Sequence, residues 1–242
     1  MSSDPVVFLP GMMCDARIFA PQIANLSRDM AVTVAPVTRG ERIEEIASNL
    51  LDLLPMRFAL AGLSMGGIVA MELLRRAPDR VTRLALMDTN PLAETPQSAT
   101  GYEPLVAKLR AGMIAEAVQM MLGGDVLAPG PERAEVLALV VEMAQGLGAE
   151  TVIRQVRALQ RRRDYQAVLR RCKVPALVLC GAEDRLTPPR RHSFMADLIP
   201  NATLCLVDGA GHLPVLEQPD TVTRALRDWL AQPYVLQRRV DA

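Results

Sequence analysis

FALAGLSMGG, at residues 58–67, joins an apolar run to a helical pattern through a serine that has a glycine two residues before it and another two residues after it. The first four residues are typical of a buried strand, and a helix is predicted over residues 65–76. A G-x-S-x-G sequence in this context predicts a sharp turn that raises Ser64 above the sheet, with the N–H of Met65 directed toward a developing oxyanion. Glycine is needed at both flanking positions because a Cβ there would collide with the other arm of the turn. Ser64 is therefore the candidate nucleophile.

On both sides of this stretch, apolar runs alternate with helical patterns. Strands are predicted at residues 6–9, 31–37, 58–61, 83–87, 174–180 and 203–207. Further helices are predicted at residues 41–54 and from Pro219 onward. Fully apolar strands that alternate with helices predict an α/β fold, in which a mostly parallel, doubly wound sheet of about six strands is covered on both faces.

Residues 91–171 interrupt this alternation because they contain no convincing strand. Amphipathic helices are predicted there at residues 103–122, 132–147 and 150–161. The predicted organisation is an α/β core of residues 1–90 and 172–242 with an inserted all-helical cap at 91–171. We expect apolar cap residues such as Leu109, Met113 and Met143 to roof the site, and residues 234–242 to form a loose tail.

A serine needs a base to become nucleophilic, and the base needs a carboxylate that orients it. Asp184 follows the strand predicted at 174–180, and His212 lies in the glycine-rich loop after the strand at 203–207. Functional groups in open α/β sheets gather at the carboxyl ends of the strands, where Ser64 is also expected. The sequence therefore predicts a triad of Ser64, His212 and Asp184.

Three other residues are alternatives to members of this triad. His192 is the only other histidine in the chain, and we interpret it as a solvated residue at a helix start. Asp88 follows the strand at 83–87 and could replace Asp184 as the acid. Glu183 is a weaker rival, because adjacent side chains point in opposite directions.

Composition excludes several other classes of protein. The 242 residues carry 27 Lys and Arg against 27 Asp and Glu, and 3% are aromatic, so the basic surplus and stacking platforms of nucleic-acid binding are missing. The longest apolar stretch, residues 174–182, is far shorter than the ~20 residues of a membrane span. The amino-terminal MSSDP lacks the features of a signal peptide, so a cytoplasmic location is expected.

Cysteine and histidine usage argues against a metal site or a cofactor. The four cysteines form no CxxC pair and are expected to be reduced core or near-core residues. Two histidines are too few for a multi-histidine metal site. The chain has no dinucleotide fingerprint, and its glycine-rich turn lacks the lysine of a phosphate loop. We therefore expect neither a cofactor nor a metal.

The chain resembles the α/β-hydrolase superfamily over nearly its full length. The resemblance rests on LPGM at residues 9–12, the serine turn at 62–67, VPALVLCGAED at 174–184 and the histidine loop at 209–219. The helical insertion is similar to the lid of small bacterial carboxylesterases, such as pimeloyl-ACP methyl esterases, enol-lactonases and C–C hydrolases. The resemblance implies that the first antiparallel hairpin of the family sheet is missing. It also implies a second oxyanion donor at the N–H of Met12 or Met13, although Pro10 replaces the histidine of many relatives.

The sequence thus predicts a serine hydrolase that acts on a small-molecule carboxylic ester, as a monomer or homodimer. One alternative is a C–C bond, lactone or thioester hydrolase with the same triad. For a C–C hydrolase, an arginine of the run Arg161-Arg162-Arg163 would bind a substrate carboxylate, although such a run is also typical of a solvated helix end. A second alternative is a hydrolase-fold binding protein with little turnover, and the complete triad argues against it.

Overall fold

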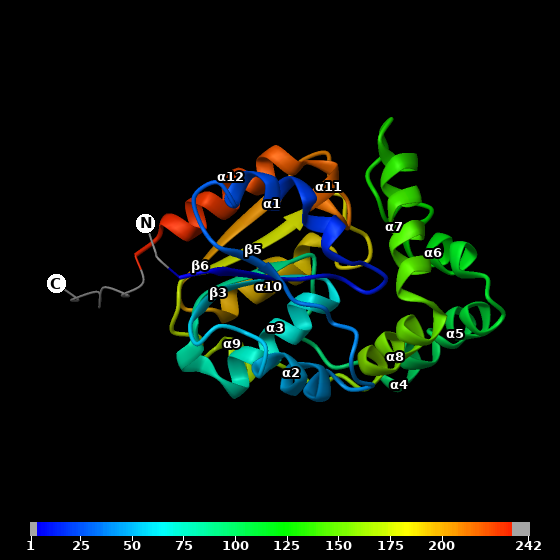
Figure 1. Ribbon diagram of the computed structural model, residues 1–242, viewed down its shortest axis with the longest axis horizontal. Coiled ribbons are helices and arrows are strands. Elements are labelled where there is room, and N and C mark those ends of the chain that lie inside the picture. Colours follow the sequence, from blue (N-terminus) through cyan, green and yellow to red (C-terminus); the bar gives the residue numbers. More distant parts are fainter. Residues whose placement is uncertain (1–3, 234–242) are drawn as a thin grey trace.

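Six parallel strands form the centre of the protein (Figure 1). They are β1 (Val6–Leu9), β2 (Val32–Val34), β3 (Phe58–Leu63), β4 (Val81–Met87), β5 (Ala176–Gly181) and β6 (Ala202–Val207). Their order in the sheet is β2-β1-β3-β4-β5-β6, and every neighbouring pair is parallel. This computed structural model describes residues 4–233. Residues 1–3 of the amino-terminal stretch and the tail expected at 234–242 lie outside the described residues.

Helices cover both faces of the sheet (Figure 1). One face carries α1 (Ala20–Leu26), α11 (Pro214–Glu217) and α12 (Pro219–Ala231), and the other carries α2 (Ile43–Leu51), α3 (Met65–Arg76), α9 (Gln166–Leu169) and α10 (Pro189–Leu198). In β1, Val6 and Phe8 pack into one hydrophobic cluster, and Val7 and Leu9 pack into the other. Successive strand side chains point to opposite faces, so a sheet covered on both sides needs continuous apolar runs. The predicted doubly wound α/β class is confirmed.

Three predicted elements differ clearly from the structure, and the first is the helix predicted at 41–54, which is shortened to Ile43–Leu51 as α2. The strand predicted at residues 31–37 is only three residues long as β2, which lies at the edge of the sheet and pairs with β1 alone. The helix predicted at 103–122 is two helices, α5 (Glu103–Arg110) and α6 (Ile114–Leu122). Gly112 separates them with a φ of 74°, a left-handed conformation that glycine adopts readily and that ends a helix.

An all-helical cap stands beyond the carboxyl ends of the strands (Figure 1). It contains α4 (Pro96–Thr100), α5, α6, α7 (Arg133–Leu147) and α8 (Ala149–Gln160), all between β4 and β5 in the chain. The loops that follow the strands therefore open toward the cap.

Across residues 4–233, no single helix has the length and apolarity to cross a membrane. The pair α7–α8 reaches that threshold only when both helices are counted together, and their axes differ by 101°.

Candidate active site

Ser64 occupies the turn between β3 and α3 in a conformation that non-glycine residues rarely adopt. Its φ is 52° and its ψ is −116°, and its N–H donates a hydrogen bond to the carbonyl of Met87 over 2.8 Å. A Cβ on Gly62 would collide with the carbonyl of Gly66, and a Cβ on Gly66 would collide with the carbonyl of Leu9. Gly62 therefore allows the sharp turn as the sequence predicts, whereas Gly66 allows the close approach of the end of β1 and not that of the other arm of the turn.

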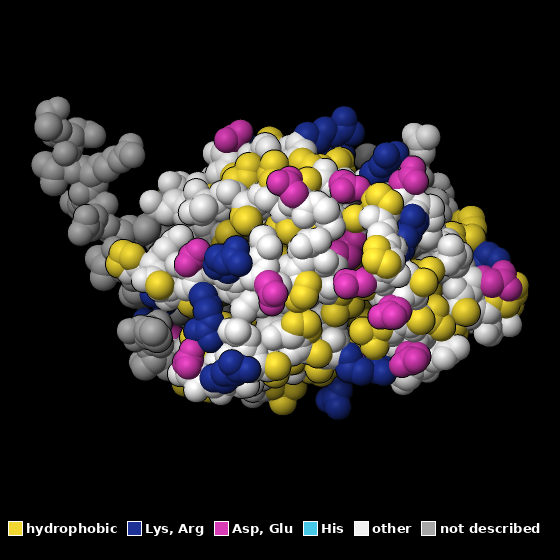
Figure 2. Space-filling view, turned by 90° about the horizontal axis from the view of Figure 1, so that it is seen from above, with side chains coloured by type: hydrophobic (Ala, Val, Ile, Leu, Met, Phe, Trp, Pro, Cys, Tyr) yellow, Lys and Arg dark blue, Asp and Glu magenta, His cyan; other side chains and the backbone are white. Residues whose placement is uncertain are grey.

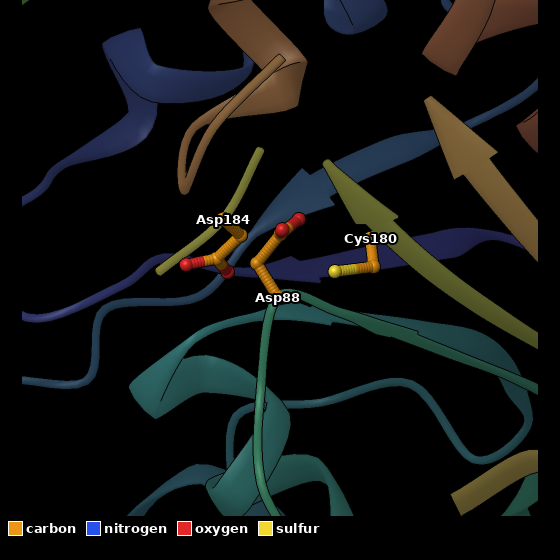
Figure 3. Close-up of side chains that lie close together, drawn as sticks. All are labelled: Asp88, Cys180 and Asp184. Atoms are coloured by element: carbon orange, nitrogen blue, oxygen red, sulfur yellow. The ribbon is translucent and has the colours of Figure 1, made fainter. Parts of the chain in front are cut away.

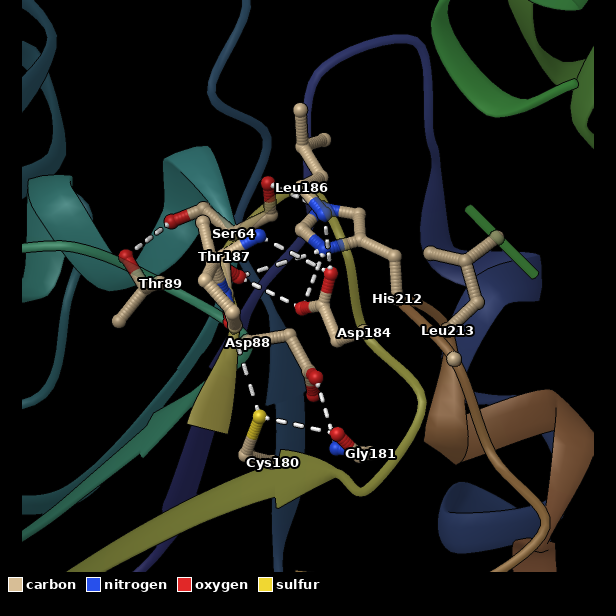
Figure 4. A network of polar contacts seen from close by, with 12 residues as sticks. Ser64, Asp88, Thr89, Cys180, Gly181, Asp184, Leu186, Thr187, His212 and Leu213 are labelled. Carbon is tan, nitrogen blue, oxygen red and sulfur yellow. Dashed lines mark hydrogen bonds and ion pairs between the residues drawn. The ribbon is translucent and has the colours of Figure 1, made fainter. Parts of the chain in front are cut away.

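The structure brings Ser64, His212 and Asp184 together at the carboxyl edge of the sheet (Figure 4). Nε2 of His212 lies 3.0 Å from Oγ of Ser64, and Nδ1 lies 2.8 Å from Oδ2 of Asp184. The Asp184 and His212 residues are 1% and 2% exposed, so water is largely excluded from their contact. Because a carboxylate only accepts, Nδ1 carries the proton and Nε2 is left to accept from the serine hydroxyl.

Asp184 is held as a carboxylate by hydrogen-bond donors on both oxygens. Oδ1 accepts from the N–H groups of Leu186 and Thr187 over 2.8 Å and 3.0 Å. Oδ2 accepts from the Thr187 hydroxyl over 2.6 Å, in addition to His212. Burial alone would raise the pKa of Asp184, but the attraction of His212 and these hydrogen bonds outweigh it and lower the pKa. Thr187 was not singled out by the sequence analysis, although it lies only three residues after Asp184.

The alternative acids do not contact His212. Asp88 is fully buried beside Asp184, and its Oδ1 accepts from the N–H of Gly181 over 2.9 Å. Burial, followed by repulsion from Asp184, raises the pKa of Asp88 well above its usual range. Glu183 is exposed to solvent. Of the three carboxyl groups considered, only Asp184 is positioned to orient the histidine.

Asp88, Cys180 and Asp184 form a cluster whose potential metal-ligand atoms lie within 4.8 Å of one another (Figure 3). Metal ligands must be deprotonated. Burial raises the pKa of the Cys180 thiol as well as that of Asp88, so both groups keep their protons. Asp184 is already occupied by its hydrogen-bond donors. The chemistry of these groups favours two protonated side chains beside a carboxylate over a metal site.

The interpretation of His192 as a solvated residue was wrong. Its ring is completely buried, and Nε2 accepts a hydrogen bond from the N–H of Thr89 over 3.0 Å. Burial lowers the pKa of His192 to about 4, so the ring is neutral at ordinary pH. His192, Met195 and Ile199 are all buried and spaced at i, i+3 and i+7. This helical spacing was the available signal that the histidine faces the core.

Thr89 connects His192 to the serine turn and was missed by the sequence analysis. Its Oγ1 donates a hydrogen bond to the carbonyl of Ser64 over 2.7 Å (Figure 4). A Cβ at Gly67 would lie 2.7 Å from the Thr89 side chain, so the threonine fills the space that this glycine leaves. Thr89 therefore supports the strained backbone of Ser64 from below.

The backbone N–H groups of Met12 and Met65, beside Ser64, have no acceptor within residues 4–233. Met65 is the first residue of α3, where N–H groups have no intrahelical partner and the helix dipole favours negative charge. The N–H of Met13 is occupied, because it donates to Oε1 of Gln155 over 3.1 Å. Of the two second donors that the resemblance allows, only Met12 is free to bind a substrate oxygen.

Gln155 fixes this loop from the cap. It is buried on α8, and its Nε2 donates to the carbonyl of Val37 over 3.2 Å while its Oε1 accepts from Met13. The sequence signal was a lone amide among the apolar residues Val152 and Val156. A buried polar side chain of this kind is retained only where it has partners.

A segment of the cap, residues 126–128 and here called the strap, lies on the histidine loop. The carbonyl of Val126 accepts from the N–H of His212 over 2.9 Å. Oε1 of Glu217 accepts from the N–H groups of Ala128 and Gly211 over 2.7 Å and 3.0 Å, and its Oε2 accepts from that of Leu213 over 2.8 Å. Burial raises the pKa of Glu217, although these donors oppose the shift. One carboxyl side chain thus joins the strap to both neighbours of His212.

A cavity of about 620 Å³ opens beside Ser64. Its lining includes Met12 and Met65, whose backbone N–H groups have no acceptor within residues 4–233. It also includes apolar side chains of the core and the cap, namely Ile68, Leu92, Leu105, Met120, Met121, Leu159 and Leu186. None of the three residues expected to roof the site lines it. Leu109 and Met143 are buried in the core cluster, and Met113 is 38% exposed.

A second cavity, of about 30 Å³, lies on the histidine side of Ser64. Its lining includes His212, Leu213, Met13 and Cys14. Ser64 and Met12 line both cavities, so the candidate nucleophile lies between a large space and a small one.

The arginine run divides between the surface and the large cavity. Arg161 and Arg163 are exposed. Nη1 of Arg161 lies 3.5 Å from Oε2 of Glu41, and Nε of Arg163 lies 3.7 Å from Oε1 of Glu44. Arg162 lines the cavity, but its guanidinium is bound to Glu94 over 2.6 Å. The run therefore supplies no free cation to the cavity.

Known proteins resemble this chain in sequence and in fold. A family model described as the alpha/beta hydrolase fold matches residues 41–219. The pimeloyl-[acyl-carrier protein] methyl ester esterase of Aromatoleum aromaticum is 29% identical over 78% of this chain and 80% of that protein. A putative carbamate hydrolase, RutD, of Pseudomonas savastanoi pv. phaseolicola is 26% identical over 93% of each chain. A solved thermophilic esterase from Thermogutta terrifontis, with malate bound, has a TM-score of 0.84 and 27% identity, covering 95% of this chain and 90% of that one.

Proposed function

The chain belongs to the α/β-hydrolase family, and from that premise we propose that it is a serine hydrolase that cleaves small carboxylic esters through an acyl-enzyme. One observation carries the proposal: Ser64, His212 and Asp184 form a continuous hydrogen-bonded line at the boundary of a cavity. A lone serine is a weak nucleophile, and this line supplies both the base and the group that orients it.

In the proposed reaction, Oγ of Ser64 attacks the ester carbonyl and its proton passes to Nε2 of His212. The carboxylate of Asp184 stabilises the positive charge that forms on the imidazole. The N–H groups of Met12 and Met65 bind the oxyanion, which carries more charge in the transition state than in the ester. Collapse of the tetrahedral intermediate expels the alcohol, which takes the proton from His212. Water, activated by the same histidine, then releases the acid and restores Ser64.

The distribution of surface charge and the size of the cavity both agree with a small-molecule substrate. On the face seen in Figure 2, acidic and basic side chains are interspersed, which agrees with the formal net charge of zero. The proposed site is a cavity of about 620 Å³, a size typical of pockets for small ligands. In this proposal, residues 91–171 form the cap, except that the last helix of this segment, α9, packs against α3 and α10 of the core, and the remaining residues form the core. The cap supplies apolar lining from α5, α6 and α8, and the strap holds the histidine loop.

The alternative of C–C bond, lactone or thioester hydrolysis has weaker support. For the C–C bond in particular, an arginine of the run at 161–163 was expected to bind a substrate carboxylate. Of that run, only Arg162 lines the cavity, and Glu94 already neutralises it, so a substrate carboxylate would have to bind elsewhere in the lining. The binding-protein alternative leaves the complete hydrogen-bonded line without a use. We therefore place ester hydrolysis first.

The proposal is tested with methyl esters of graded acyl length, assayed by proton release, beside a ring-fission dienoate as the C–C substrate. We expect ester hydrolysis to dominate, and a fluorophosphonate probe to label Ser64. Ser64→Ala should reduce turnover by several orders of magnitude, because triad members act as a unit. Labelling of another serine, with Ser64→Ala still active, would contradict the proposal, and faster cleavage of the dienoate would favour the alternative.

A further inference from the structure

Arg191 lines the large cavity with a guanidinium that has no acceptor in the part of the chain that the structure describes. It lies in the first turn of α10 and is half-buried. No hydrogen bond or ion pair involves its side chain among residues 4–233. Partial burial of a guanidinium costs hydration free energy when no counter-charge is present. An anionic partner would offset this cost.

The one acidic side chain that lines the cavity cannot serve as that partner. Oε1 of Glu94 binds Arg162 over 2.6 Å and accepts from the hydroxyl of Tyr102 over 3.3 Å. Its other oxygen accepts from the hydroxyl of Ser98. The Glu94 and Arg162 side chains are each 9% exposed, so this pair is closed and neutral. Arg191 therefore leaves the cavity with a net positive charge.

Asn90 adds a second donor to the same cavity. Its Oδ1 accepts from the N–H of Leu92 over 3.1 Å, which leaves its Nδ2 free of acceptors within residues 4–233. The cavity thus offers two unused donors, Arg191 and Asn90, within a lining that is otherwise mainly apolar. This is the pattern of a site for a chain that is apolar along its length and anionic at one point.

The two cavities also distinguish the acyl group from the alcohol. The leaving alcohol must take its proton from Nε2 of His212, and His212 lines the small cavity but not the large one. The small cavity is about 30 Å³, roughly a twentieth of the large one. A methyl-sized alcohol group fits there, and the acyl group is left to the large cavity that contains Arg191.

We propose that Arg191 binds a carboxylate at the far end of the acyl group, so that the preferred substrates are small-alcohol monoesters of dicarboxylic acids. This inference rests on the proposed ester hydrolysis at Ser64 and adds the charge and polarity of the substrate. A guanidinium pairs with a carboxylate through two parallel hydrogen bonds, which fixes the orientation of the acyl chain as well as its charge.

The test compares monomethyl and dimethyl esters of the same dicarboxylic acids, from succinate to pimelate. The two esters of each acid differ mainly in the charge at the far end. The wild-type protein should prefer the monomethyl ester at one chain length, and Arg191→Gln should lower its kcat/KM for that ester by about 10- to 100-fold, mainly through KM. The rate with the dimethyl ester should change less than about twofold. Arg191→Lys should recover part of the preference, because it keeps the charge and loses the paired geometry.

Arg190→Gln is the matched control, because Arg190 is the exposed neighbour on the same helix and does not line the cavity. It should leave both esters unaffected. Equal losses for both esters in Arg191→Gln, or no wild-type preference for the monomethyl ester at any length, would overturn the inference. Dimethyl ester hydrolysis that still depends on Ser64 would then leave the proposed function standing. Hydrolysis that persists in Ser64→Ala would instead reject the proposed function itself.

Discussion

The main-chain N–H of His212 donates a hydrogen bond to the carbonyl of Val126, 86 residues earlier in the chain and in the cap, over 2.9 Å. The base of the candidate triad is therefore positioned by two parts of the fold at once. The core supplies Asp184 to its ring, and the cap supplies Val126 to its backbone. Glu217 reinforces this arrangement from α11.

The first prediction concerns Glu217 as a positioning residue. Glu217→Ala removes the acceptor of three N–H groups, in Ala128, Gly211 and Leu213, and an unsatisfied buried donor costs about 1–3 kcal/mol. We expect kcat for the smallest ester to fall by about tenfold, with a smaller change in KM, because the loop that carries His212 loses its anchor. Glu217→Gln keeps one carbonyl oxygen and should recover most of kcat.

The control for this prediction is Glu183→Ala, at an exposed carboxylate near the same edge of the sheet. Steady-state kinetics of the three variants, with thermal unfolding measured in parallel, separates loss of positioning from loss of fold. An unchanged kcat in Glu217→Ala would show that the histidine loop keeps its position without this side chain.

The second prediction ranks the two buried aspartates. Asp184→Asn should reduce kcat by about 10⁴-fold, because an amide at this position favours the wrong tautomer of His212. Asp88→Asn should cost less than about tenfold, since the raised pKa of Asp88 makes it a neutral carboxyl that asparagine closely matches in shape. Purified variants assayed with one methyl ester decide the ranking, and the reverse order would transfer the role of the acid to Asp88.

The third prediction concerns the pH dependence of stability. The fold holds the pKa of His192 at about 4, whereas a histidine in an unfolded chain titrates near ~6.5. Between these values the unfolded chain binds a proton that the folded protein does not, so the free energy of unfolding decreases as the pH falls. From pH 7 to pH 5 this decrease should be about 2 kcal/mol.

His192→Gln isolates this contribution, because glutamine keeps an acceptor for the N–H of Thr89 and does not titrate. Urea unfolding of both proteins at the two pH values measures it, since all other titrating groups are shared. The variant should lose less stability than the wild type on acidification. His192→Gln should also leave the acid limb of the activity profile in place, whereas a displaced limb would make His192 part of the catalytic base.

The fourth prediction concerns the cap residues that line the large cavity. Leu105→Phe narrows the space beside Ser64, so it should reduce hydrolysis of long acyl esters more than that of methyl acetate. The expected discrimination is about 1–3 kcal/mol, the range for one altered contact in an apolar pocket. Met113→Phe is the control, because Met113 is 38% exposed and does not line the cavity. Equal losses for long and short esters would show that Leu105 supports the cap without selecting substrates.

The sequence was sufficient to predict the sheet and the turn at Ser64 because those features are local. Continuous apolar runs indicate strands that are buried on both faces. The glycines around Ser64 indicate a turn that is too crowded for any residue with a Cβ. The placement of Asp184 and His212 together followed from one general rule, that parallel strands end at the same edge. The break at Gly112 was missed because the apolar spacing continues on both sides of it.

Gln155, which the sequence analysis missed, and His192, which it interpreted wrongly, both act through contacts between distant parts of the chain. Gln155 lies 142 residues from Met13, and His192 lies 103 residues from Thr89. Periodicity can indicate that such a side chain is buried, but it contains no information on which group it meets. Their partners became visible only in the folded arrangement.

The strap also sets a rule for redesigning this scaffold. A Cβ on Gly211 would collide with the carbonyl of Val126, so the cap and the histidine loop are fitted to each other at the level of the backbone. A foreign cap grafted between β4 and β5 would bring a new roof, but it would deprive the N–H of His212 of its acceptor and Glu217 of one of its donors. In such a graft, residues 126–128 of this protein should therefore be kept. Only the helices on either side of them should be replaced by those of the donor.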